Sequence, residues 1–126
     1  LYLGQKRVPG GPLSPAFSRK ITREVERKSE RLTGLCAAGM YEDSLPIISE
    51  LNAYVDNTIN EISIFENYEI VADKIEGDAN VAVAFCENKK VQDIADAKEA
   101  ERIAREAKIE EEKEKRIAAF EMLSSY

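Results

Sequence analysis

The sequence predicts an all-α fold: a small antiparallel bundle of three or four helices, with an extended N-terminal arm and a long charged C-terminal helix. Apolar residues recur at helical spacing through the middle of the chain. Residues 91–123 contain neither Gly nor Pro and consist almost entirely of strong helix formers. Nothing in the chain offers a partner for a lone strand. We expect an arm over 1–14, a bundle over 15–96 and the charged helix over 97–126.

The charge of the chain is uneven along its length. Its 126 residues carry a net charge of −6, yet residues 1–35 have a net charge of +5 and residues 36–96 a net charge of −10. We call residues 1–35 the basic head and expect its charge to be neutralised within the fold by the acidic residues of 36–96. The alternative is that the basic head docks on an acidic partner. The acidic balance argues against nucleic acid as the main partner. No run of residues is apolar enough to predict a transmembrane helix. Because the chain starts with Leu and not with Met, we expect that its first residues are missing or that a leader peptide has been removed.

The first fourteen residues predict an extended arm, because Gly4, Pro9, Gly10, Gly11 and Pro12 exclude a helix or a central strand. Two interpretations carry equal weight: a disordered tail, or an arm that becomes ordered on a partner. The apolar residues of the arm that would make this contact are Leu1, Tyr2, Leu3, Val8 and Leu13.

The first helix should begin at Ser14-Pro15 and end near Gly39. Its apolar face is formed by Phe17, Ile21, Val25, Leu32, Leu35 and Cys36. The opposite side carries an arginine row at four-residue spacing, composed of Arg19, Arg23, Arg27 and Arg31. We interpret the row as a solvated face, because three Glu residues dilute it. The functional alternative is a docking surface for acidic protein, lipid headgroups or nucleic acid.

Two further helical patterns follow. One begins near Asp43-Ser44, with Pro46 in its first turn, and predicts a buried face of Ile48, Leu51, Val55, Ile59 and Ile62. The other starts near Tyr68, and Gly77-Asp78 predicts a turn after it. Residues 80–85 alternate like a strand but also fit a helical face, and we expect helix. A second, weaker break is expected at residues 88–90.

The C-terminal helix is dominated by charge. Of the nineteen residues from Lys98 to Arg116, fourteen are charged, half of them basic and half acidic. Three expected ion pairs, at about 0.2–0.5 kcal/mol each, are Glu101–Arg105, Glu111–Lys115 and Glu112–Arg116. The apolar residues expected to contact a partner are Ile103, Ile117, Phe120 and Leu123. The heptad pattern fails, so a long coiled-coil dimer is weakly supported.

The sequence predicts no catalytic residue, no cofactor site and no metal site. The chain has no His and no Cys-x-x-Cys motif. We expect Cys36 and Cys86 to be two buried free thiols; the alternative is a disulfide in an oxidising lumen.

These observations favour a non-catalytic structural or linker subunit of a larger protein assembly. The expected setting is peripheral to an organellar membrane complex, in a chloroplast or mitochondrion. In organisation alone, the chain resembles the small helical extrinsic subunits of photosynthetic or respiratory complexes; no motif carries this resemblance. The alternative is a peripheral module that binds anionic lipid or nucleic acid through the arginine row. A third hypothesis is an enzyme with an unfamiliar acidic site.

Overall fold

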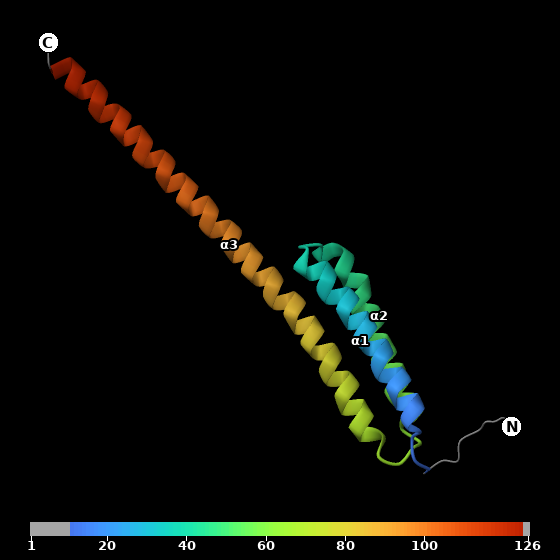
Figure 1. The fold of residues 1–126 in the computed structure, drawn as a ribbon. Coiled ribbons are helices and arrows are strands. Elements are labelled where there is room, and N and C mark those ends of the chain that lie inside the picture. Colours follow the sequence, from blue (N-terminus) through green and yellow to red (C-terminus); the bar gives the residue numbers. More distant parts are fainter. Residues whose placement is uncertain (1–10, 125–126) are drawn as a thin grey trace. The chain divides into compact units, whose positions relative to one another are not determined.

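The computed structural model describes residues 11–124, and this part of the chain is all-α. It contains helix α1 (Pro15–Ala37), helix α2 (Tyr41–Ile62) and helix α3 (Tyr68–Ser124), without any strand (Figure 1). The predicted fold class is therefore confirmed. The chain divides into two compact units at Lys90–Val91, and α3 runs through both. We call residues 11–90 the bundle unit and residues 91–124 the terminal segment.

Helix α1 has the start and the stop that its sequence predicts. The hydroxyl of Ser14 accepts a hydrogen bond of 3.0 Å from the Phe17 N–H, and Pro15 follows in the first turn. At the other end, Gly39 has a φ of 77°. Its N–H donates to the Cys36 carbonyl, and the Met40 N–H donates to the Leu35 carbonyl. These two bonds satisfy carbonyls of the last helical turn, and the left-handed conformation suits Gly.

Helix α2 begins at Tyr41, earlier than the expected start at Asp43-Ser44. The Ser44 hydroxyl does not cap a downstream N–H; it donates to the Tyr41 carbonyl at 2.6 Å. The Ser44 N–H itself donates to the Met40 carbonyl, so the helix is already formed at this point. Pro46 therefore lies inside α2 rather than in its first turn.

The two breaks predicted in the third helical region are wrong, because α3 is continuous from Tyr68 to Ser124. Gly77 is exposed, and nothing lies within 4 Å of the place where a Cβ would be. A helical Gly costs only about 0.5–1 kcal/mol relative to Ala, which the surrounding turns can offset. Lys74 and Asp78 form an ion pair of 3.2 Å across the same turn. The Asn and Lys residues at 88–90 have ordinary helix propensities, and they do not end a helix by themselves.

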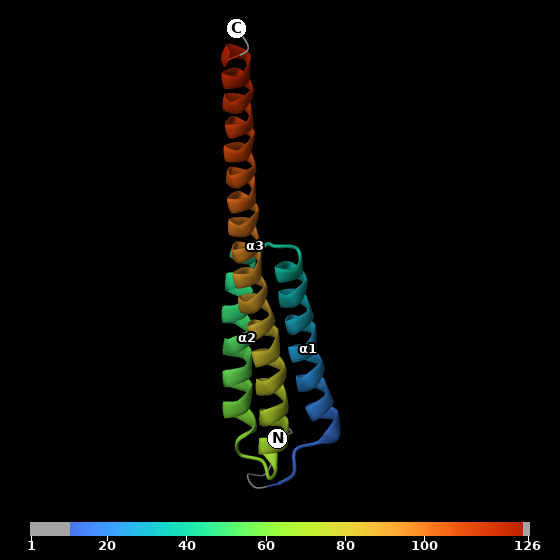
Figure 2. The ribbon, with the colours of Figure 1, turned by 90° about the vertical axis from the view of Figure 1, so that its left-hand side faces the viewer.

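The bundle unit packs α1, α2 and the first part of α3 side by side, with α2 antiparallel to the other two (Figures 1 and 2). All three helices and the α2–α3 loop contribute to one core. Its fully buried large side chains include Val25, Leu32, Leu51, Ile62 and Ile75. On α3 the buried positions are mostly small, which lets its backbone approach the other two helices closely. On α2, Leu51, Val55 and Ile62 are buried as expected, whereas Ile48 and Ile59 are only partly buried.

The prediction that the two cysteines are free thiols is wrong. Cys36 of α1 and Cys86 of α3 form a disulfide inside the core. The two residues are far apart in the sequence, but the antiparallel return of the chain through α2 brings them together. The structure therefore contains the alternative, a disulfide, which requires an oxidising environment.

The described end of the arm contacts the bundle unit. The Gly11 carbonyl accepts a hydrogen bond of 2.8 Å from the Glu66 N–H in the α2–α3 loop, and Pro12 forms a β-bridge with Glu66. Leu13 is partly buried against the core. The remaining predicted arm contacts, Leu1, Tyr2, Leu3 and Val8, lie outside the described residues.

Candidate interaction surfaces

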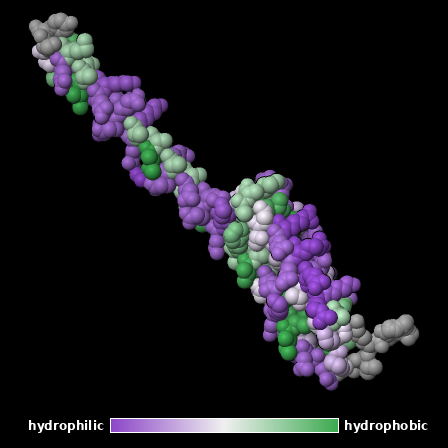
Figure 3. Space-filling model, in the orientation of Figure 1, coloured by the Kyte–Doolittle hydropathy of each residue, from purple (hydrophilic) through white to green (hydrophobic). Residues whose placement is uncertain are grey.

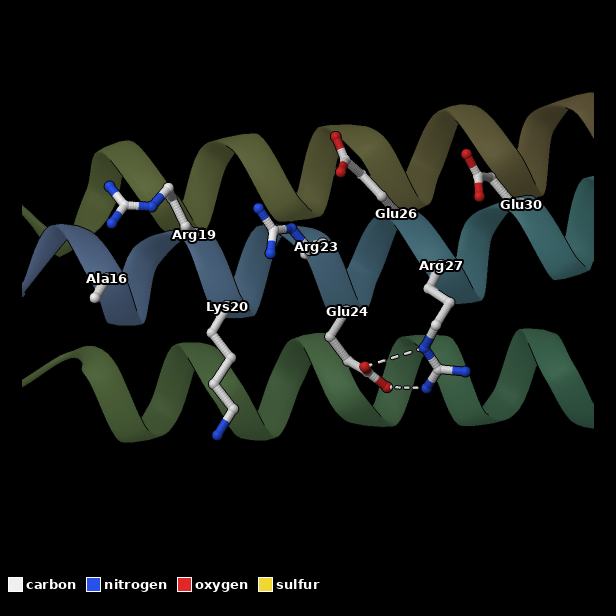
Figure 4. Close-up of a pocket in the computed structure, with 8 residues that line it drawn as sticks. All are labelled: Ala16, Arg19, Lys20, Arg23, Glu24, Glu26, Arg27 and Glu30. Carbon is white, nitrogen blue, oxygen red and sulfur yellow. Dashed lines mark hydrogen bonds and ion pairs between the residues drawn. The ribbon is translucent and has the colours of Figure 1, made fainter.

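The arginine row lies on the exposed side of α1. All four of its members are exposed, as the sequence indicates, but they differ in their surroundings. Arg27 donates hydrogen bonds to the Glu24 carboxylate, three residues earlier on the same helix (Figure 4). Within residues 11–124, Arg19, Arg23 and Arg31 form no ion pair with a carboxylate. Glu24 thus neutralises Arg27 in the middle of the row, whereas Arg19 and Arg23, nearer the start of α1, remain available to an anion.

Lys28 connects α1 to α2, although the sequence analysis did not single it out. Its ammonium lies 2.7 Å from the Glu50 carboxylate and 3.3 Å from Glu24, and 5.4 Å from the centre of the Tyr54 ring. The hydrogen bond to Glu50 raises the pKa of Lys28 and lowers the pKa of Glu50. The hydrogen bond from Arg27, with a further contribution from Lys28, lowers the pKa of Glu24. Part of the basic head is therefore neutralised within the fold.

A groove between α1 and α3 brings together residues that the sequence analysis treated separately. It has a volume of about 390 Å³. Arg19 and Arg23 line it from α1, and Lys74 lines it from α3. The other lining residues are Ser18, Thr22, Glu26, Ile70 and Val71. Figure 4 shows Arg19 and Arg23 on the side of α1 that faces α3, whereas Lys20, Glu24 and Arg27 point to the α2 side. Lys74 had no predicted role, because only the packing of α3 against α1 places it beside the arginines.

The terminal segment is a helix without a core of its own. None of its residues is buried, and apart from Asp93 all are exposed. Two of the three expected ion pairs form, Glu101–Arg105 at 3.1 Å and Glu111–Lys115 at 3.2 Å. Arg102 pairs with both Glu99 and Glu106, which was not predicted. These pairs support a solvent-exposed helix in water, since each links successive turns.

Large apolar side chains interrupt the charged surface of the terminal segment (Figure 3). All four predicted contact residues of this segment are exposed, with Phe120 at 71% and Leu123 at 74%. Ile109 is also exposed, although it was not among the predicted contact residues; it lies about three turns before Phe120 and therefore on the same side of the helix. Ile117, Phe120 and Leu123 follow one another at three-residue steps, so neighbouring members share a face. We call Ile109, Ile117, Phe120 and Leu123 the apolar tip. Ile103 lies nearer the start of the segment and is also exposed.

No cluster of three potential metal ligands occurs in the part of the chain from residue 11 to residue 124. None of its helices is long and apolar enough to cross a bilayer. The depression that Figure 4 shows is lined by α1 alone, so it is a furrow along one helix and not an enclosed cavity.

Comparisons of the chain with models of protein families, with curated proteins and with solved structures find no match. The interaction surfaces therefore have to be interpreted from their own chemistry.

Proposed function

We propose that this protein is a non-catalytic structural subunit that joins a larger protein assembly through the terminal segment of α3. The observation that carries the proposal is that this segment is a continuous helix in which no residue is buried. Folding of the bundle unit uses the core residues up to Cys86, so the helix beyond Lys90 contributes little to that core. A helix of this length without buried residues is best explained as a binding surface for a partner.

The apolar tip supports a protein partner. Burial of a large apolar side chain contributes about 1.5–3 kcal/mol, so covering Phe120 and Leu123 supplies a substantial part of a binding free energy. Lys113, Lys115 and Arg116 alternate with glutamates around the tip, and the stretch from Lys98 to Arg116 carries equal numbers of basic and acidic residues. Balanced charge removes long-range repulsion and lets a partner helix approach the helix surface closely.

The finer part of the proposal concerns the setting of the assembly. We place the protein at the periphery of an organellar membrane complex, photosynthetic or respiratory, in contact with other protein subunits. Support comes from the acidic charge and from the Cys36–Cys86 disulfide, which favours an oxidising compartment. The arginine row is less suited to serve as the main binding surface, because Arg27 is already paired with Glu24.

Replacement of two tip residues tests the proposal. Phe120→Ser with Leu123→Ser should leave the thermal midpoint of the isolated protein nearly unchanged, since both side chains are exposed. The same variant, expressed as a tagged full-length chain in its native cells, should no longer co-migrate with a high-mass complex on a native gel. Leu45→Ser with Val81→Ser is the matched control, because these residues are also exposed but lie on the bundle unit.

Three results would contradict the proposal. If the tip variant unfolds the isolated protein, Phe120 and Leu123 belong to its folded core. If the unaltered chain migrates as a monomer, or if the tip variant and the control enter the complex equally well, the apolar tip does not carry assembly.

A further inference from the structure

We propose that the groove between α1 and α3 is a binding site for a phosphate group, held by Arg19, Arg23 and Lys74. This site is independent of the proposed assembly function, because all its residues belong to the bundle unit. It lies near the start of α1, where Arg19 and Arg23 have no carboxylate partner within residues 11–124.

The arrangement of the cations is the first reason. Arg19 and Arg23 are one helical turn apart and line the same side of α1, while Lys74 lines the groove from α3. Guanidinium groups present planar pairs of N–H donors that match the oxygens of a phosphate, and Lys adds a compact charge. Three positively charged residues from two helices thus line one groove.

The second reason is the availability of these groups. In the described part of the chain, Arg19 and Arg23 have no carboxylate partner, in contrast to Arg27 and Lys28 on the same helix. Lys74 pairs with Asp78 at 3.2 Å, and both side chains keep contact with solvent. Glu26 is the one carboxylate among the groove-lining residues, so these carry a net charge of +2. In a chain with a net charge of −6, this is a local excess of positive charge.

The third reason concerns the size and the further chemistry of the groove. The hydroxyls of Ser18 and Thr22 add neutral donors, which also suit phosphate oxygens. A volume of about 390 Å³ falls within the range of small-molecule sites, roughly 300–1,000 Å³. Nucleic acid is disfavoured, because a polyanion needs many phosphate contacts and residues 36–96 carry a net charge of −10. The occupant is therefore a single phosphate group, either on a soluble ester or on the headgroup of a lipid.

Titration of the full chain with phosphate-bearing probes tests the site. Glycerol 3-phosphate, a soluble phosphate ester, represents the soluble source, and phosphatidylcholine vesicles with and without phosphatidic acid represent the lipid source. Measurements by calorimetry and by amide chemical shifts should be made at an ionic strength of about 10 mM, where charges are weakly screened. We expect saturable binding of at least one probe, with shifts centred on Arg19, Arg23 and Lys74.

Matched double variants show whether the groove or the total charge is responsible. Arg19→Gln with Arg23→Gln should weaken binding by at least about tenfold, because two charge-assisted contacts are lost. Arg27→Gln with Arg31→Gln removes the same charge from the same helix outside the groove and should weaken binding less than the groove variant does, because no direct contact to the phosphate is lost. Circular dichroism of each variant confirms that the helices are retained.

Each outcome of these measurements either supports or overturns the proposed phosphate site. Saturable binding of glycerol 3-phosphate, or of vesicles only when they contain phosphatidic acid, supports the site and identifies its source if the groove variant weakens the binding more than the control variant does. No saturable binding of any probe overturns the proposal. Equal weakening by both double variants also overturns it, because the interaction then reflects the overall charge of α1.

Discussion

Cys36 of α1 and Cys86 of α3 form a disulfide within the bundle unit, with their Cα atoms 5.3 Å apart. The bond joins the first and third helices across a sequence separation of 50 residues. Both residues are buried, with exposed fractions of 0% and 3%, so reductants reach the bond only when the unit opens. The bundle unit is thereby closed by a covalent link in addition to its small apolar core.

Removal of this link should lower the free energy of unfolding. For Cys36→Ala with Cys86→Ala we expect a loss of about 2–4 kcal/mol, because the unfolded chain regains the freedom of a long loop. Urea denaturation followed by circular dichroism measures the loss. The unaltered protein, unfolded in the presence of a strong reductant, is the control and should show a similar loss. Equal stabilities of variant and oxidised protein would indicate that the bond does not constrain the unfolded chain.

Replacement of Gly77 tests the continuity of α3. Gly77→Ala should stabilise the protein by about 0.5–1 kcal/mol, since Gly is a poor helix former and the added Cβ meets no atom within 4 Å. Gly39→Ala is the matched control and should destabilise by about 1–2 kcal/mol, because Gly39 has a φ of 77°. Thermal unfolding measures both effects. A destabilising Gly77→Ala variant would argue for the turn that the sequence had predicted there.

Leu51 tests the core of the bundle unit. Its side chain is completely buried between the helices, so Leu51→Ala should cost about 2–5 kcal/mol. Asn52→Ala, at the adjacent exposed position of α2, should change stability by no more than about 0.5 kcal/mol. Chemical denaturation of the two variants gives the comparison. A loss below about 1 kcal/mol at Leu51 would be incompatible with a core packed as the structure shows.

The contact between Lys28 and Glu50 should make stability depend on pH. The pKa of Glu50 is lowered below its ordinary value of 4.5, so its contribution is complete above about pH 4.5 and is lost as the pH falls through the lowered pKa. The pKa of Lys28 is raised above 10.5, so its contribution is lost only as the pH rises through that raised value.

The variant Glu50→Gln should therefore have a lower thermal midpoint than the unaltered protein at neutral pH, and the difference should vanish in strong acid. Glu61→Gln, with the same change of charge on an exposed part of α2, should show a smaller difference at neutral pH. Thermal midpoints across the acid range measure the effect. A difference for Glu50→Gln that persists unchanged at low pH would rule out the ion pair as its cause.

Local sequence signals predicted the helical class, both ends of α1 and the start of α3. Ser14 and Pro15 set the start of α1, and Gly39 sets its end, because capping depends on residues that are neighbours in the chain. The apolar spacing of Val25, Leu51 and Val55 also identified buried positions, since a helix turns at a fixed period. The charged terminal segment could be predicted for the same reason: its ion pairs join residues three or four positions apart in the sequence.

The tertiary structure decided what depends on residues far apart in the sequence. Spacing alone does not show that Cys36 meets Cys86, that Lys28 meets Glu50, or that Lys74 lies in a groove with Arg19 and Arg23. The continuity of α3 through Gly77 was likewise not a local property: local propensity opposes the helix there by only about 1 kcal/mol. Packing of Ile75 and Ala79 in the core on either side of Gly77 outweighs this small cost, because tertiary burial contributes more than the propensity of one residue.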